Sequence, residues 1–149
     1  HGELNMSNPF LFIIDNIQML NSMGHSITQT YCGEEVIIRF HYITQSKDIE
    51  NVVFVFNLYR ADGLYICGAT SLMDSYYPMR PGKEGWISIK FPHLRLLAGE
   101  YYWRVAIDDQ RGIGVYAAMV PVCRFRVIDK MEAIGLIDID RDWTFEIRS

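Results

Sequence analysis

Short apolar segments separated by turn residues dominate the pattern of hydrophobic and polar positions along the chain. Segments rich in Val, Ile, Phe and Tyr, bounded by Gly, Pro, Asn and Asp, are typical of β-strands rather than helices. Eight such segments are present: 10–20, 35–43, 51–59, 64–69, 86–91, 101–108, 121–128 and 142–148. Strands at this spacing predict one domain with an all-β fold, an immunoglobulin-like antiparallel β-sandwich of about eight strands.

Alternation along a strand indicates which side chains face the core, because successive side chains point to opposite faces of a sheet. The residues expected inside are Val36, Ile38, Phe40, Tyr42, Tyr101, Trp103, Val105, Ile107, Cys123, Phe125 and Val127. Those expected outside are Arg39, His41, Tyr102, Arg104, Ala106, Asp108, Arg124 and Arg126. The segment 51–59 is apolar on both faces, as in a central strand, and Asn57 and Tyr59 are placed outward.

Three connections carry specific signals. Asp62-Gly63 between two apolar runs predicts a β-hairpin. The segment 97–101, Leu-Ala-Gly-Glu-Tyr, has the spacing of a tyrosine corner, in which Tyr101 bonds back across the preceding loop. The segment 70–85 is the longest expected loop, and loops of that length in compact domains are often functional.

Charge and cysteine content exclude several classes of function. The formal net charge is -4, which provides no field to attract a nucleic acid. Cys32, Cys67 and Cys123 are isolated, with no CxxC pair, and are expected to be reduced. The sequence contains no secretory-signal pattern and no apolar run near 18 residues.

No catalytic constellation is visible either. The chain has no GxSxG or GxxxxGK[ST] motif, and His25, His41 and His93 lack metal-ligand spacing. Asp108-Asp109 precedes Gln110-Arg111-Gly112, where a turn needs polar residues anyway. We therefore expect a domain that is not an enzyme and that holds no metal and no cofactor.

The positive signal is a surface. If 101–108 and 121–128 pair as neighbours, their outward side chains share one sheet face with 51–59. The candidate carbohydrate-binding residues on that face are Tyr102, Arg104, Arg124, Arg126, Tyr59 and Asn57. Aromatic rings pack on the C–H faces of sugars, and Arg forks donate charge-assisted hydrogen bonds to hydroxyls and carboxylates. The alternative is that outward Arg residues keep the sheet soluble and discourage edge pairing.

The order of motifs resembles the C-terminal domain of Wzt, the ATP-binding subunit of ABC transporters that export lipopolysaccharide O-antigen. The motifs are the strand ending in Asp62-Gly63, the following Leu-Tyr-Ile-Cys-Gly-Ala-Thr of 64–70, the tyrosine corner, and Phe125-Arg126-Val127. The resemblance covers about 13–143. It implies a non-catalytic carbohydrate-binding module that recognises the capped non-reducing end of the O-antigen polysaccharide.

Partners and location follow from the resemblance. It implies a cytoplasmic position at the inner face of the bacterial inner membrane and contact with the transporter membrane subunit through a missing upstream ATPase domain. The excess of Arg over Lys, ten to four, adds the hypothesis that the recognised terminus is acidic. The competing class is a structural or adhesin-type sandwich without glycan specificity; a glycan-processing enzyme would need clustered acids with shifted pKa values.

The expected domain organisation has three parts. Residues 1–8 are a remnant or linker, 9–129 the sandwich, and 130–149 a C-terminal extension. In the extension, Trp143, Phe145 and Ile147 alternate with polar residues, which predicts a strand with one buried face. The long connection allows this strand to be exchanged in a homodimer or to fold back on its own sheet. The resemblance also favours exchange, since Wzt C-terminal domains can pair in this way.

Overall fold

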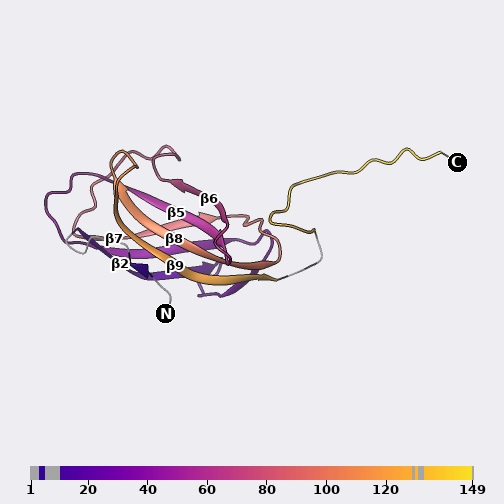
Figure 1. Ribbon diagram of the computed structural model, residues 1–149, viewed down its shortest axis with the longest axis horizontal. Coiled ribbons are helices and arrows are strands. Elements are labelled where there is room, and N and C mark those ends of the chain that lie inside the picture. The colour runs from indigo at the N-terminus through magenta and orange to yellow at the C-terminus, as the bar shows by residue number, and fades with distance from the viewer. Residues whose placement is uncertain (1–3, 6–10, 129, 131–132, 149) are drawn as a thin grey trace.

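Two β-sheets stacked face to face make up the body of the molecule (Figure 1). The computed structural model describes residues 4–5, 11–128, 130 and 133–148. Its strands are β1 (Leu4–Asn5), β2 (Phe12–Asn21), β3 (Gln29–Tyr31), β4 (Val36–Thr44), β5 (Val52–Arg60), β6 (Tyr65–Thr70), β7 (Glu84–Phe91), β8 (Gly99–Asp109) and β9 (Val115–Ile128). The expected all-β sandwich is confirmed, and the part of the chain that the structure describes contains no helix.

The larger sheet has the order β1-β9-β8-β5-β6, with β3 pairing in parallel with β9, and the smaller sheet has the order β2-β4-β7. All other pairs are antiparallel. The expected pairing of β8 with β9 is therefore confirmed. Strands β6 and β7 lie at the free edges of the two sheets on the same side of the sandwich, which leaves an opening between the layers there.

The core lies between the sheets and is made by alternate residues of the long strands. Phe12, Ile38 and Phe40 enter it from the smaller sheet, while Trp103 and Phe125 enter from the larger sheet. The rings of Trp103 and Phe125 stack at 5.8 Å between centroids. Burial of this continuous apolar surface is the main stabilising term for such a fold. Alternation predicted the inward positions of Ile38, Phe40, Trp103 and Phe125 correctly.

Two local predictions are also confirmed. Asp62-Gly63 forms the β5–β6 hairpin, and Gly63 has a φ of +92°, which a side chain would strain. The Tyr101 hydroxyl donates a 2.6 Å hydrogen bond to the carbonyl of Leu97, so the tyrosine corner is present.

Several expectations are corrected. Cys123 is only half-buried, because a β-bulge with a φ of +48° shifts the strand and gives the core position to Val122. His41 is buried rather than exposed, because Asp15, Trp86 and Glu84 surround it. The structure also contains β3, and β9 begins at Val115 instead of residue 121. Residues 4–5, expected in a linker, pair with β9.

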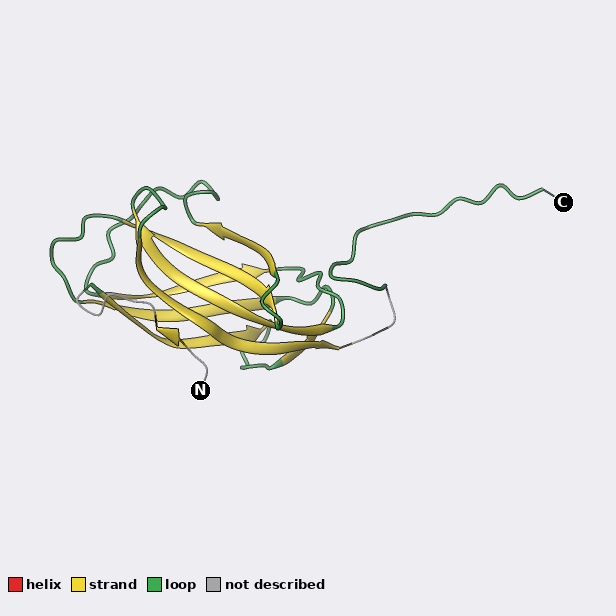
Figure 2. Cartoon of the chain, in the orientation of Figure 1, coloured by secondary structure: helices red, strands yellow, loops and turns green. Residues whose placement is uncertain are grey.

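The C-terminal segment leaves the sandwich after a short anchor. The amide of Leu97 donates to the carbonyl of Leu136, and the amide of Asp138 donates to the carbonyl of Arg95. Beyond this anchor the chain runs extended and away from both sheets (Figures 1 and 2). The strand expected at 142–148 is not formed in the single chain, because no strand lies beside it to complete its hydrogen bonds.

Candidate functional site

The outer face of the larger sheet brings together aromatic and arginine side chains from four strands. Cross-strand register places Tyr65 of β6 beside Tyr59 of β5, and Tyr59 beside Tyr102 of β8. The bulge in β9 brings Arg124 over the Tyr102 ring, with Cζ 5.3 Å from the ring centroid. This row of side chains, with Asn57, Arg104 and Arg126 beside it, is called the Arg–Tyr face below.

The rings of the Arg–Tyr face are ordered by one another. Tyr59 and Tyr102 stack with centroids 5.2 Å apart and an interplanar angle of 12°. Tyr65 packs against Tyr59 at 5.3 Å and 50°. Stacked and tilted arrangements at these distances are favourable ring geometries. The result is a row of rings held against one another, of which Tyr65 is exposed and Tyr59 and Tyr102 are partly exposed.

A second row of polar contacts runs beside the rings. Arg104 donates a 2.7 Å hydrogen bond to the side-chain oxygen of Asn57, and Asn57 donates to the Tyr65 hydroxyl at 3.2 Å. Gly68 lies opposite Asn57 on β6, and a Cβ there would collide with the Asn57 amide and the Tyr65 hydroxyl. Glycine at this position therefore lets the polar row extend onto β6.

Arg126 lies at the end of the face, opposite Glu100 of β8 and Gln29 of β3. It lines a hollow of about 280 Å³ together with Arg124, Glu100 and Gln29. Two guanidinium groups at one hollow favour an acceptor-rich ligand group such as a carboxylate or phosphate.

All six residues proposed from sequence lie on this one face, and Asn57 and Tyr59 point outward as expected. Sequence reasoning missed Tyr65. Alternation counted back from Gly68 would place Tyr65 on the inner face. A register shift between Leu58 and Tyr59 moves Tyr65 onto the outer face instead.

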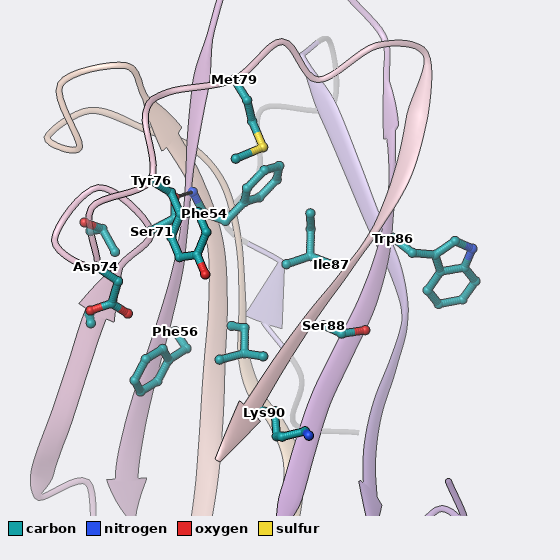
Figure 3. Close-up of a pocket in the computed structure, with 13 residues that line it drawn as sticks. Phe54, Phe56, Ser71, Asp74, Tyr76, Met79, Trp86, Ile87, Ser88 and Lys90 are labelled. Carbon is teal, nitrogen blue, oxygen red and sulfur yellow. Dashed lines mark hydrogen bonds between the residues drawn. The ribbon is translucent and has the colours of Figure 1, made fainter. Parts of the chain in front are cut away.

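A separate cavity of about 590 Å³ lies in the opening between β6 and β7 (Figure 3). Phe54, Phe56 and Ile87 line it, and Tyr76 and Met79 of the loop after β6 border it. Asp74 and Ser71 supply polar atoms on one side. The cavity is mainly apolar, so its chemistry differs from that of the Arg–Tyr face. The loop at 70–85, expected to be functional, contributes to this cavity.

Among the described residues, no group of three or more His, Cys, Asp and Glu side chains is arranged to hold a metal ion. Those residues also include no helix long and apolar enough to cross a membrane.

The fold and this face define an immunoglobulin-like β-sandwich domain with one sheet surface rich in Tyr and Arg. The chain belongs to the Wzt C-terminal domain family, whose model matches residues 12–139. A solved structure described as the crystal structure of the C-terminal domain of Wzt is similar, with a TM-score of 0.80 and 15% sequence identity. That similarity covers 97% of this chain and 89% of the other. No curated protein sequence matches the chain.

Proposed function

We propose that this domain binds the capped non-reducing end of an O-antigen polysaccharide on the Arg–Tyr face, without catalysing a reaction. Membership of the Wzt C-terminal domain family supports a role in polysaccharide export by an ABC transporter. The proposed position of the binding site rests on one observation. Four neighbouring strands place in one row the side chains of Tyr65, Tyr59, Tyr102 and Arg124.

The chemistry of the face suits the end of a sugar chain. The Tyr side chains provide apolar ring surface and hydroxyl groups. Arg104 and Arg124 provide hydrogen-bond donors for the hydroxyl groups of a sugar ring. Arg124 and Arg126 border the hollow in which an acidic terminal group of the ligand would be bound most strongly. The domain would then act on the cytoplasmic side of the inner membrane, joined to the transporter through an upstream ATPase domain.

The first test is the loss of individual Arg side chains. Arg104→Ala and Arg124→Ala should each weaken binding of an O-antigen polysaccharide about ten- to a hundredfold, because a charge-assisted contact contributes roughly 1.5 to 3 kcal/mol. Isothermal titration calorimetry measures the change. Arg111→Ala is the matched control, since Arg111 pairs with Asp109 at an exposed turn. Unchanged affinity in both face variants would place the site elsewhere.

The second test concerns the charge of the ligand. If the terminal group is acidic, affinity should fall when the titration is repeated at high salt, because ions screen attraction at an exposed site. The two arginines of the hollow predict this loss of affinity. In Arg126→Ala the affinity should depend less steeply on salt concentration. An affinity independent of ionic strength would indicate a neutral terminus held by rings and amides.

Assembly as a homodimer belongs to the same proposal. In the single chain the side chains of Trp143, Phe145 and Ile147 are 73%, 67% and 86% exposed. The apolar cavity between the free edges of β6 and β7 is a place where the same segment of a second copy could cover Phe54, Phe56 and Ile87. The competing function, an adhesin-type module, would lack an ATPase with a Walker motif in the full-length protein.

A further inference from the structure

The outer face of the smaller sheet carries an exposed tryptophan in an ordered polar setting. Register places Asp15 of β2, His41 of β4 and Trp86 of β7 side by side across three strands. The Trp86 ring lies on the opposite side of β7 from Ile87 (Figure 3), although Trp86 is also one of the residues that border the cavity at this edge of the sheet. Asp15, Arg39, His41, Glu84 and Trp86 are called the Trp86 platform below.

Neighbouring side chains hold the ring of Trp86 in place. The Arg39 guanidinium lies over it, with Cζ 3.8 Å from the ring centroid, and the His41 ring packs at 4.9 Å and 52°. Trp86 is nevertheless 45% exposed. An aromatic ring that is both fixed and exposed loses little conformational freedom when a ligand packs on it.

His41 fixes the two carboxylates of the platform. Its Nδ1 lies 2.8 Å from an oxygen of Asp15, and its Nε2 lies 2.7 Å from an oxygen of Glu84. Both ring nitrogens can donate only when the imidazole is protonated. The hydrogen bond with Glu84, followed by that with Asp15, raises the pKa of His41 above its usual value, although partial desolvation opposes this. In its protonated form, which the raised pKa favours, the ring orients both carboxylates.

The charges of the platform balance one another. When His41 is protonated, two carboxylates face one imidazolium and one guanidinium, so a ligand needs no net charge to be accepted. Asp15 and Glu84 bond His41 through one oxygen each, and their side chains are 42% and 67% exposed. Their remaining acceptor capacity suits hydroxyl donors, and the part of the indole that Arg39 and His41 leave exposed offers apolar surface to C–H groups.

We propose that the Trp86 platform is a second carbohydrate-binding surface that takes neutral, hydroxyl-rich pyranose units. It goes beyond the end-recognition proposal, because it lies on the other sheet and uses different chemistry from the Arg–Tyr face. A protein partner is the less favoured occupant. A protein interface centred here would bury Asp15, Glu84, Arg39 and protonated His41, whereas the centres of protein interfaces are depleted in charged residues.

The experiment titrates the intact domain with neutral hexasaccharides of glucose, mannose and N-acetylglucosamine. The indole N–H signals are followed by NMR, and the signal of Trp86 is assigned from its absence in Trp86→Phe. At least one sugar should shift that signal saturably, and Trp86→Ala should weaken this binding about tenfold or more. Trp143→Ala is the matched control, because Trp143 is also exposed but lies in the C-terminal segment.

Further variants separate the platform from the Arg–Tyr face and from a structural effect. His41→Gln should weaken binding of the same sugar, since it removes the donor to one or both carboxylates, while Arg104→Ala should leave it unchanged. Thermal unfolding of each variant checks the fold.

Failure of all the neutral sugars to shift the indole signal of Trp86, or equal binding by Trp86→Ala, would overturn the proposal. A change in oligomeric mass in Trp86→Ala would instead assign the platform to contact between copies. Loss of sugar binding only in Arg104→Ala would leave the end-recognition proposal standing and this one overturned.

Discussion

At the scale of single residues, Asp108 is a buried acid in the larger sheet. Its side chain is on the outer face of β8 and the residue is only 6% exposed. One carboxylate oxygen has no hydrogen-bond partner in the described part of the chain. Burial raises the pKa of Asp108, although the charge of Arg104 opposes the shift. An acid of this kind destabilises the folded state whenever it is ionised.

Asp108→Asn should therefore raise the melting temperature at pH 7, by an amount corresponding to about 1 kcal/mol. The folded-state pKa lies above the unfolded value, so the wild-type protein loses stability as pH rises between the two values. The advantage of the Asn variant should thus grow with pH over that window and vanish below it. Differential scanning fluorimetry across pH measures this trend.

Asp62→Asn provides the matched control with the opposite sign. Asp62 accepts two hydrogen bonds from Arg60, which lower its pKa to about 2. Its stabilising contribution is present above the unfolded pKa and is lost as pH falls toward 2. The Asn variant should be the less stable one at pH 7. A lower melting temperature for Asp108→Asn at pH 7 would contradict the account given for Asp108.

At the scale of elements, alternation predicted most strand faces because burial follows the two-residue period of a strand. Phe40 and Trp103 are in the core and Tyr102 and Arg104 are on the surface, as expected. The period fails where a bulge interrupts pairing, at Asn16 in β2 and at Cys123 in β9, since a bulge depends on the partner strand.

Functional side chains were harder to predict than strands because their surroundings come from distant positions. The partners of His41 are 26 and 43 residues away in sequence, and both lie on strands that flank β4. Nothing near His41 in the sequence indicates that it is buried. The six residues of the expected binding face share one face because they lie on three long neighbouring strands, although a bulge interrupts β9.

The C-terminal segment is an element that the single chain leaves incomplete. Trp143 and Phe145 stack at 5.6 Å on one side of the segment, as alternation predicts, but no sheet covers them. The similarity to the solved Wzt domain extends over 97% of the chain, which is more of the chain than the two sheets contain. On the proposal made above, a second copy of the chain would supply the hydrogen-bonding partner of this segment.

At the scale of the whole molecule, the two sheets offer surfaces of different charge. The Arg–Tyr face gathers guanidinium groups, although the chain as a whole has a net charge of -4. The Trp86 platform balances its charges internally. On the two proposals above, one sheet would hold an acidic chain end and the other would hold neutral sugar units. Salt titrations would distinguish the two surfaces, because only binding of the acidic end should weaken at high salt.

The final prediction is the oligomeric state. Three large apolar side chains in water are unfavourable by about 25 cal/mol for each Å² of apolar surface they expose, so the segment should find a cover. Exchange of identical segments between two copies provides that cover and uses the free edge next to the apolar cavity. Light scattering should give twice the chain mass of 17.3 kDa at tens of micromolar protein.

Deletion of residues 131–149 should turn this dimer into a monomer, or cause aggregation through the uncovered cavity. Replacement of Trp143, Phe145 and Ile147 by Ser tests the apolar contacts with the length of the chain retained, and it should also give a monomer. Replacement of Thr144 and Glu146 by Ser, on the alternate positions of the same segment, should leave the dimer intact. A monomeric mass for the intact domain would mean that the segment folds back on its own sheet, and the exchange model would be wrong whatever ligand the Arg–Tyr face binds.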